Sequence, residues 1–129
     1  MGMYSWTDYC NIVIREGKRE AFMQYLEELK NDTRPNWSEY GKDCAKTISV
    51  LDDDVVEIQI ESWKIISYWY DSTLDFFDRL SEYLEGELGL SFETHEEYAR
   101  IHFQESGTAY ELGAMRYEVY KSADLRHGD

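Results

Sequence analysis

The fold is decided by residues 47–61, which read TISVLDDDVVEIQIE. In the second half of this stretch, from Val55 to Glu61, apolar and polar residues alternate. Such alternation is typical of an antiparallel strand with one buried and one solvated face. The three aspartates at 52–54 favour a turn, so we predict a β-hairpin that joins Thr47–Leu51 to Val55–Glu61.

The residues before the hairpin predict one strand and one helix. Tyr9–Arg15 alternates in polarity and predicts a strand, which Gly17 ends. From Lys18 to Asn31, apolar residues recur at helical spacing and predict an amphipathic helix. Pro35 lies shortly after this segment, where it prevents the helix from continuing.

The residues after the hairpin predict a second helix and further strands. The aromatic and apolar residues 63–70 are expected to extend the sheet or to cover its end. Ser72 is a candidate N-cap for a second helix, which we expect to run to Glu85 and to end near Gly86. Further β-rich segments follow at Leu90–Thr94, Tyr98–Gln104 and Thr108–Tyr120, with a turn at Ser106–Gly107.

The order of these elements predicts the fold class. It is β-α-β-β-α-β with one or more extra C-terminal strands, which indicates an α+β protein with a ferredoxin-like plan. We therefore expect an antiparallel sheet with two helices on one face. One domain, residues 1–129, accommodates the whole chain, with residues 1–7 and 121–129 expected to be frayed ends.

The composition excludes several classes of protein. A formal net charge of −14 opposes direct binding to nucleic acid or to anionic membranes. No apolar run reaches the roughly 20 residues that span a bilayer, and the first ten residues do not resemble a secretory signal. We therefore expect a cytoplasmic protein, in which Cys10 and Cys44 are reduced thiols.

The negative charge is concentrated in the middle of the chain. Fourteen of the 27 acidic residues lie between Asp52 and Glu97, where only Lys64 and Arg79 oppose them. A requirement for solubility alone gives no reason for this concentration, although an acidic surface that serves only solubility remains the alternative. The asymmetry favours a surface that binds a basic partner.

The second predicted helix carries the clearest acidic pattern. Asp75, Asp78, Glu82 and Glu85 follow one another at spacings of three, four and three, opposite an apolar stripe. On a helix they would form a row about 15 Å long. A row of carboxylates of this length resembles a short run of nucleic acid phosphates, which predicts charge mimicry. The alternative is the ordinary solvated face of an amphipathic helix.

No set of residues predicts catalysis. The spacing of His95 and His102 is not that of a zinc site, and the glycines do not form a phosphate-binding loop. We expect no enzyme activity, no metal and no cofactor. The candidate partner-binding residues are acidic or aromatic: Asp52, Asp53, Asp54, Asp75, Asp78, Glu82, Glu85, Glu87, Trp63 and Trp69.

Three segments resemble the YubB-like family of plasmid and phage proteins, which has a ferredoxin-like domain. The segments are the strand Tyr9–Ile14, the helix pattern Phe76-Phe77-x-x-Leu80-Ser81-x-Tyr83, and a closing pattern that runs from Tyr98 through Phe103, Glu105, Gly107 and Tyr110 to Gly113. Residues 36–42 match the family's Asn-Trp-Gly loop only in part. The Trp-Ser-Pro-Pro segment that precedes the second helix in the family is missing.

The resemblance implies a mobile genetic element, and the host cell cytoplasm if a phage encodes the protein. In that context we expect an inhibitor that occupies a basic surface of a host defence protein or nuclease complex by charge mimicry. The alternative is a small-molecule-binding or regulatory module with an aromatic pocket at residues 63–70. A homodimer is also left open.

Overall fold

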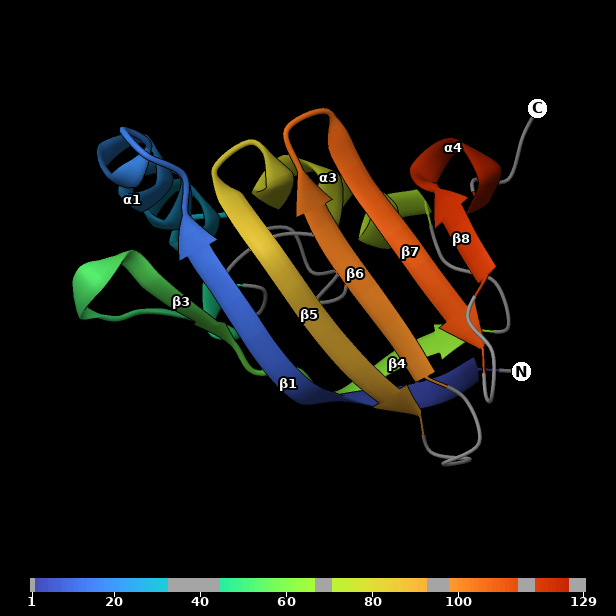
Figure 1. Cartoon of the computed structure of the whole chain (residues 1–129). Helices are drawn as coiled ribbons and strands as arrows, with labels where there is room; N and C mark the ends of the chain where they lie inside the picture. The colour runs from blue at the N-terminus through green and yellow to red at the C-terminus, as the bar shows by residue number, and fades with distance from the viewer. Residues whose placement is uncertain (1, 33–44, 67–70, 93–97, 114–117, 126–129) are drawn as a thin grey trace.

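The computed structural model describes residues 2–32, 45–66, 71–92, 98–113 and 118–125, with the backbone alone for 2–4, 61–66, 71–73 and 118. It is an α+β protein with an antiparallel sheet (Figure 1). The strands are β1 (Gly2–Ile14), β2 (Ile48–Val50), β3 (Val55–Ile58), β4 (Glu61–Ile66), β5 (Leu84–Phe92), β6 (Tyr98–Gln104), β7 (Gly107–Gly113) and β8 (Glu118–Lys121). The helices are α1 (Arg19–Lys30), α3 (Asp71–Ser81) and α4 (Ser122–Leu125), with a 3₁₀ turn η1 (Asp52–Asp54).

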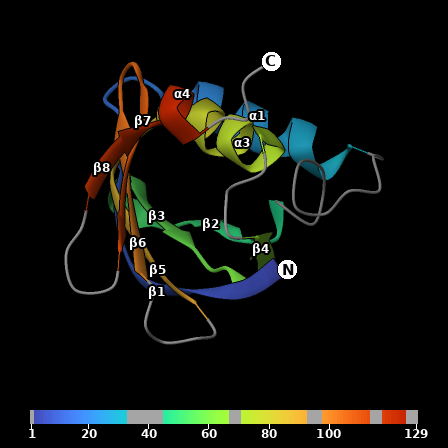
Figure 2. The ribbon, with the colours of Figure 1, turned by 90° about the vertical axis from the view of Figure 1, so that its right-hand side faces the viewer.

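Seven strands form one continuous path in the order β2-β3-β1-β5-β6-β7-β8, and β4 pairs with the N-terminal half of β1. Each strand runs antiparallel to its neighbours. Figure 2 shows α1, α3 and α4 on one side of the curved sheet. No helix among the described residues covers the other side, which we call the outer face. The predicted α+β class and the antiparallel sheet are therefore confirmed.

The core lies between the sheet and the helices. On α1, Phe22, Tyr25, Leu26 and Leu29 are buried at helical spacing, as the sequence predicts. On α3 the buried side chains include Phe76, Phe77 and Leu80, which meet inward residues of β5, β6 and β7. Each fully buried side chain of this size contributes about 1.5–3 kcal/mol of transfer free energy. The pleat of each strand then leaves the intervening residues on the outer face.

Both chain ends of the described structure differ from the prediction of frayed termini. β1 begins at Gly2, because its first five residues pair with β4 and part of this segment also pairs with β5. At the other end, Lys121 closes β8 and residues 122–125 form α4. The N-terminus of α4 is capped by Asp124, whose Oδ2 accepts a hydrogen bond from the backbone N–H of Lys121 at 2.8 Å. The hairpin around η1 is confirmed, although β3 ends at Ile58 and Glu61 belongs to β4. The first predicted helix is also confirmed and is one residue shorter at each end than predicted.

The second predicted helix is shorter than expected. It begins at Asp71, so Ser72 lies inside it, and it ends at Ser81 instead of Glu85. Leu84 already belongs to β5 and is paired with Ile14 of β1. The predicted end of the helix was too late because Leu80 and Leu84 are four residues apart, a spacing that fits one face of a helix. Leu84 and Leu88 are also separated by an even number, so they share the buried face of a strand.

Candidate functional site

An acidic surface forms where β1 ends and where β3 and β5 begin. The register pairs Val13 with Val55 of β3 and with Glu85 of β5, so these three chain segments meet at one end of the sheet. Acidic residues come from the turn after β1, from η1, from the turn before β5 and from β5 itself. They are Glu16, Asp52, Asp53, Asp54, Glu82 and Glu85, and we call them the acidic end.

Two ion pairs reduce the charge of the acidic end, and Lys18 and Arg79 are exposed in the chain segments next to Glu16 and Glu82. Arg19 Nη1 lies 2.6 Å from Asp54 Oδ1, and Arg15 Nη1 lies 3.8 Å from Glu85 Oε2. Only 18% of the Arg15 side chain is exposed. Its guanidinium donates to the carbonyl oxygen of Ser81 at 3.1 Å, which caps the C-terminus of α3. Arg15 therefore supports the fold more than it screens the surface.

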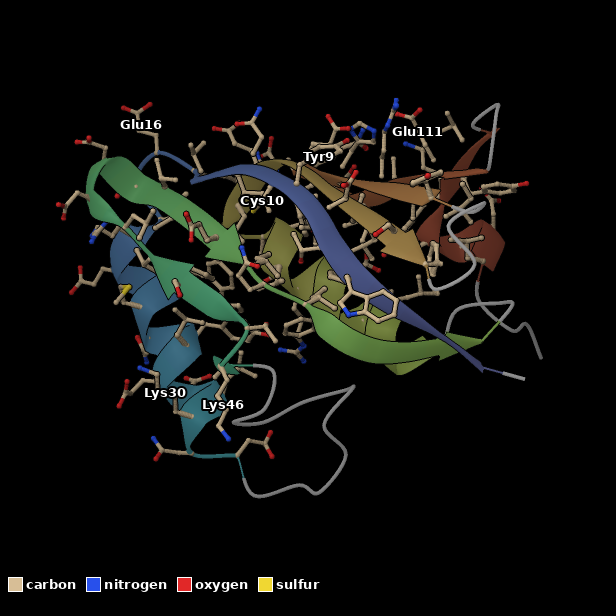
Figure 3. All side chains as sticks on the ribbon, turned by 90° about the horizontal axis from the view of Figure 1, so that it is seen from below. Tyr9, Cys10, Glu16, Lys30, Lys46 and Glu111 are labelled. Carbon is tan, nitrogen blue, oxygen red and sulfur yellow. The ribbon has the colours of Figure 1, made fainter. Side chains whose placement is uncertain are left out.

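The other pole of α1 has a different character. Figure 3 shows Glu16 next to the hairpin of β2 and β3, and it shows Lys30 and Lys46 near the opposite end of α1. Both lysines are exposed. Lys30 Nζ lies 3.8 Å from Glu27 Oε2, so acidic and basic side chains are mixed at this end of α1, whereas the acidic end lies at the other.

The predicted row of four carboxylates on one helix is wrong. Asp75 and Asp78 lie on α3 and are half-buried, whereas Glu82 lies in the turn after the helix and Glu85 lies in β5. Glu82 and Glu85 are exposed and belong to the acidic end. The helix therefore does not present a 15 Å row of charges, and the acidic surface is assembled from several segments instead.

Asp78 holds the fold together. Its Oδ1 accepts hydrogen bonds from the backbone N–H of Thr108 (3.2 Å), from the Thr108 hydroxyl (2.5 Å) and from the Ser122 hydroxyl (2.8 Å). The Thr108 hydroxyl also lies 2.8 Å from the hydroxyl of buried Tyr110. These bonds tie α3 to β7 and to α4. A carboxylate used in this way is a poor candidate for partner binding.

A second group of polar residues lies on the outer face and was not predicted. The Tyr9 hydroxyl donates to Glu87, and Arg100 Nε lies 4.0 Å from the same carboxylate. Arg100 Nη1 lies 3.8 Å from Glu111 Oε2, and His102 Nε2 lies 2.5 Å from Glu111 Oε1. The five residues come from β1, β5, β6 and β7. Figure 3 shows Tyr9 and Glu111 on the side of the sheet away from α1.

The sequence contained a signal for this network, because polar residues alternate with apolar residues along the strands and so share the outer face. Arg100 and His102 alternate with buried Ala99, Ile101 and Phe103. Only the strand order could bring them beside Glu87 and Glu111, because the residues involved come from four separate strands. Glu87 is the one predicted site residue in the network, and it lies on β5.

Cys10 lies on the inner side of β1 and is half-buried. Its Sγ accepts a hydrogen bond from the backbone N–H of Ile58 and donates to the carbonyl oxygen of Val56, both at 3.4 Å. Burial raises the pKa of this thiol above its ordinary value, and the nearby charge of Glu57 raises it further. A half-buried free thiol in such an environment has a structural role.

Several predicted residues lie outside the described part of the structure. Trp69 is one of them, and Trp63 lies in β4 with only its backbone described, so the aromatic pocket expected at residues 63–70 is not placed. Among the described residues, no three His, Cys, Asp or Glu side chains lie close enough together to hold a metal ion. The described helices are also too short or too polar to cross a membrane.

No protein-family model, curated protein or solved structure matches this chain.

Proposed function

We propose that this protein is a non-catalytic binding protein whose acidic end occupies a basic, nucleic-acid-binding surface of another protein. The observation that carries the proposal is the convergence of six carboxylates from remote chain segments at one end of the sheet. The basic side chains that contact them, Arg15 and Arg19, each pair with one carboxylate. The surface that remains is negative and exposed.

The shape of the molecule supports the same proposal. The helices α1, α3 and α4 lie on one side of the curved sheet (Figure 2), and the acidic end lies where β1 ends and β3 and β5 begin. Carboxylates that are placed by paired strands can meet a groove without refolding of the chain, which preserves binding free energy. Basic grooves that accept phosphates accept carboxylates through charge-assisted hydrogen bonds. An inhibitor of a nuclease or another nucleic-acid-handling protein, acting in the cytoplasm, is the class we favour.

We also infer a ferredoxin-like core. β1, α1, β2, β3, α3 and β5 follow one another in the order expected for that plan once the inserted β4 is set aside, and β2, β3, β1 and β5 are adjacent in the sheet. β6, β7 and β8 extend this core at the β5 side. The core explains why β1, β3 and β5 bring their ends together and so supports the proposed site.

The test is capture of partners from a cell extract on the tagged protein, followed by displacement with duplex DNA. We expect captured proteins to bind nucleic acid, to be released by excess DNA, and to be lost between about 50 and 200 mM salt. The triple variant Glu16→Lys, Asp52→Lys and Glu82→Lys should weaken capture about tenfold or more at low salt.

The matched control is Glu27→Lys, Glu28→Lys and Asp8→Lys, which changes the net charge by the same amount at exposed positions away from the acidic end. We expect this variant to retain its partners. Equal loss in both triple variants would show that net charge alone drives capture, and capture that resists DNA would contradict the proposal.

A further inference from the structure

The outer side of β1 presents a strip of uncharged side chains. The pleat buries Ile12 and Ile14 and turns Tyr9, Asn11 and Val13 outward. Tyr9 is 39% exposed and Val13 is 37% exposed. These values are high for large apolar side chains, so the strip is a surface on which another molecule can bury apolar area.

Carboxylates border this strip on both sides. On β3, the outward residues are Val55 and Glu57, and the register sets Val55 beside Val13. On β5, the register sets Glu85 beside Val13 and Glu87 beside Asn11. Neighbouring strands lie about 4.8 Å apart, so a side chain lying along β1 is within reach of carboxylates to its left and right.

The aromatic end of the strip is held in a fixed position. The ring of Tyr9 lies directly on Gly89, where a Cβ atom would be 2.1 Å from Tyr9 Cε1. The Tyr9 hydroxyl donates to Glu87, so the ring is held at both its face and its tip. Because the ring is already ordered, binding to it costs little additional conformational entropy.

We propose that the strip formed by Tyr9, Asn11 and Val13 binds an arginine-rich segment of the basic partner. The inference rests on the proposed function and extends it by assigning a second contact surface and the kind of side chain that it accepts. The aliphatic stems of arginine pack on Val13 and Val55, and the guanidinium groups reach Glu57, Glu85 and Glu87. One guanidinium stacks on the Tyr9 ring beside the Glu87 carboxylate.

The geometry favours arginine over lysine. A guanidinium is planar, so it stacks on an aromatic ring while its edge donates to a carboxylate, whereas an ammonium group does so poorly. Glu87 already accepts the Tyr9 hydroxyl and lies 4.0 Å from Arg100 Nε, so an incoming guanidinium has to share this carboxylate with Arg100. The acidic end, by contrast, offers charge without an aromatic surface and should not distinguish the two residues.

The experiment compares a fluorescent ten-residue oligo-arginine peptide with an oligo-lysine peptide of the same length by anisotropy titration. We expect the protein to bind oligo-arginine about tenfold more tightly. Tyr9→Leu should weaken oligo-arginine about tenfold and oligo-lysine hardly at all. Gly89→Ala should act in the same direction, because its Cβ displaces the Tyr9 ring and leaves the residue itself intact.

Two controls separate this site from the acidic end. Tyr98→Leu removes a half-buried tyrosine of β6, outside the strip, and should leave both affinities unchanged. The triple acidic-end variant Glu16→Lys, Asp52→Lys and Glu82→Lys should weaken both peptides equally. Circular dichroism and thermal melting check that each variant is folded.

The outcomes distinguish the two proposals. If neither peptide binds at low salt, the proposed function fails and this inference fails with it. If both peptides bind and neither Tyr9→Leu nor Gly89→Ala alters their ratio, the strip is not the arginine site while the proposed function stands. A dimer that depends on Tyr9, seen by sedimentation without peptide, would assign the strip to a second copy of the chain and overturn the inference.

Discussion

At the residue scale, the acidic side chains fall into two classes that the sequence does not separate. Asp78 and Glu82 are four residues apart and look equivalent on a helical projection. The structure uses Asp78 as an acceptor for Thr108 and Ser122, and it leaves Glu82 exposed after the helix has ended. A carboxylate that serves the fold and one that stays exposed therefore differ in their neighbours, not in their spacing.

Removing the Asp78 carboxylate should destabilise the protein. Asp78→Ala leaves the Thr108 and Ser122 groups without their acceptor, and we expect the free energy of unfolding to fall by about 2–3 kcal/mol in urea titrations. Asp78→Asn keeps an acceptor oxygen and should cost less. Glu82→Ala is the exposed control and should change stability by less than about 0.5 kcal/mol. Equal effects of Asp78→Ala and Glu82→Ala would refute the structural role of Asp78.

The Cys10 thiol should react slowly with alkylating reagents. Its pKa is raised by burial, so less thiolate is present at pH 8 than for a free cysteine. In a Cys44→Ser background, iodoacetamide should modify Cys10 more slowly in the native protein than in urea. The same raised pKa means that stability falls as the pH rises above the ordinary value of the thiol, because the unfolded chain ionises first. Native-state labelling at the unfolded rate would contradict the assignment.

At the scale of elements, the sequence predicts those whose pattern has one interpretation. The hairpin around η1 combines strict alternation with a triplet of aspartates, and α1 combines helical spacing with an acidic first turn and a basic last turn. The end of α3 has two interpretations, because Leu80, Leu84 and Leu88 suit a helix and a strand equally. The pairing of Leu84 with Ile14 decides between them, and such a long-range contact is not encoded locally.

Gly86 offers a direct test of that boundary. Its φ of 125° and a Cβ position 2.1 Å from the carbonyl oxygen of Asn11 make alanine unfavourable there. We expect Gly86→Ala to lower the free energy of unfolding by about 3 kcal/mol, from backbone strain and displacement of β1. Gly17 also has a positive φ, of 78°, but a Cβ atom there would meet no atom within 4 Å. We therefore expect Gly17→Ala to lower the free energy of unfolding by only about 1 kcal/mol. A helix that continued to Glu85 would instead tolerate alanine at position 86.

At the scale of the whole molecule, charge and fold act against each other. A net charge of −14 on a chain of 129 residues produces self-repulsion that favours expansion. The location of the acids on a few chain segments was visible in the sequence, but their convergence at one end of the sheet depends on strand order. The candidate site was therefore predictable in its chemistry and not in its shape.

Salt should have opposite effects on stability and on binding. Between about 10 and 150 mM salt the screening length shortens from roughly 30 to 8 Å, which weakens repulsion among the carboxylates. We expect the melting temperature, followed by circular dichroism, to rise by several degrees while affinity for a basic peptide falls. If both quantities moved in the same direction, repulsion at the acidic end would not be the dominant electrostatic term.

The central position of β1 also governs the order of events during synthesis. β1 leaves the ribosome before β3, β4 and β5, and each of these strands pairs with it. The last of them ends at Phe92, so β1 has an unpaired edge until residue 92 has emerged. Contacts of such long sequence separation slow folding. We therefore expect β1 to complete its pairing only after β5 has been synthesised.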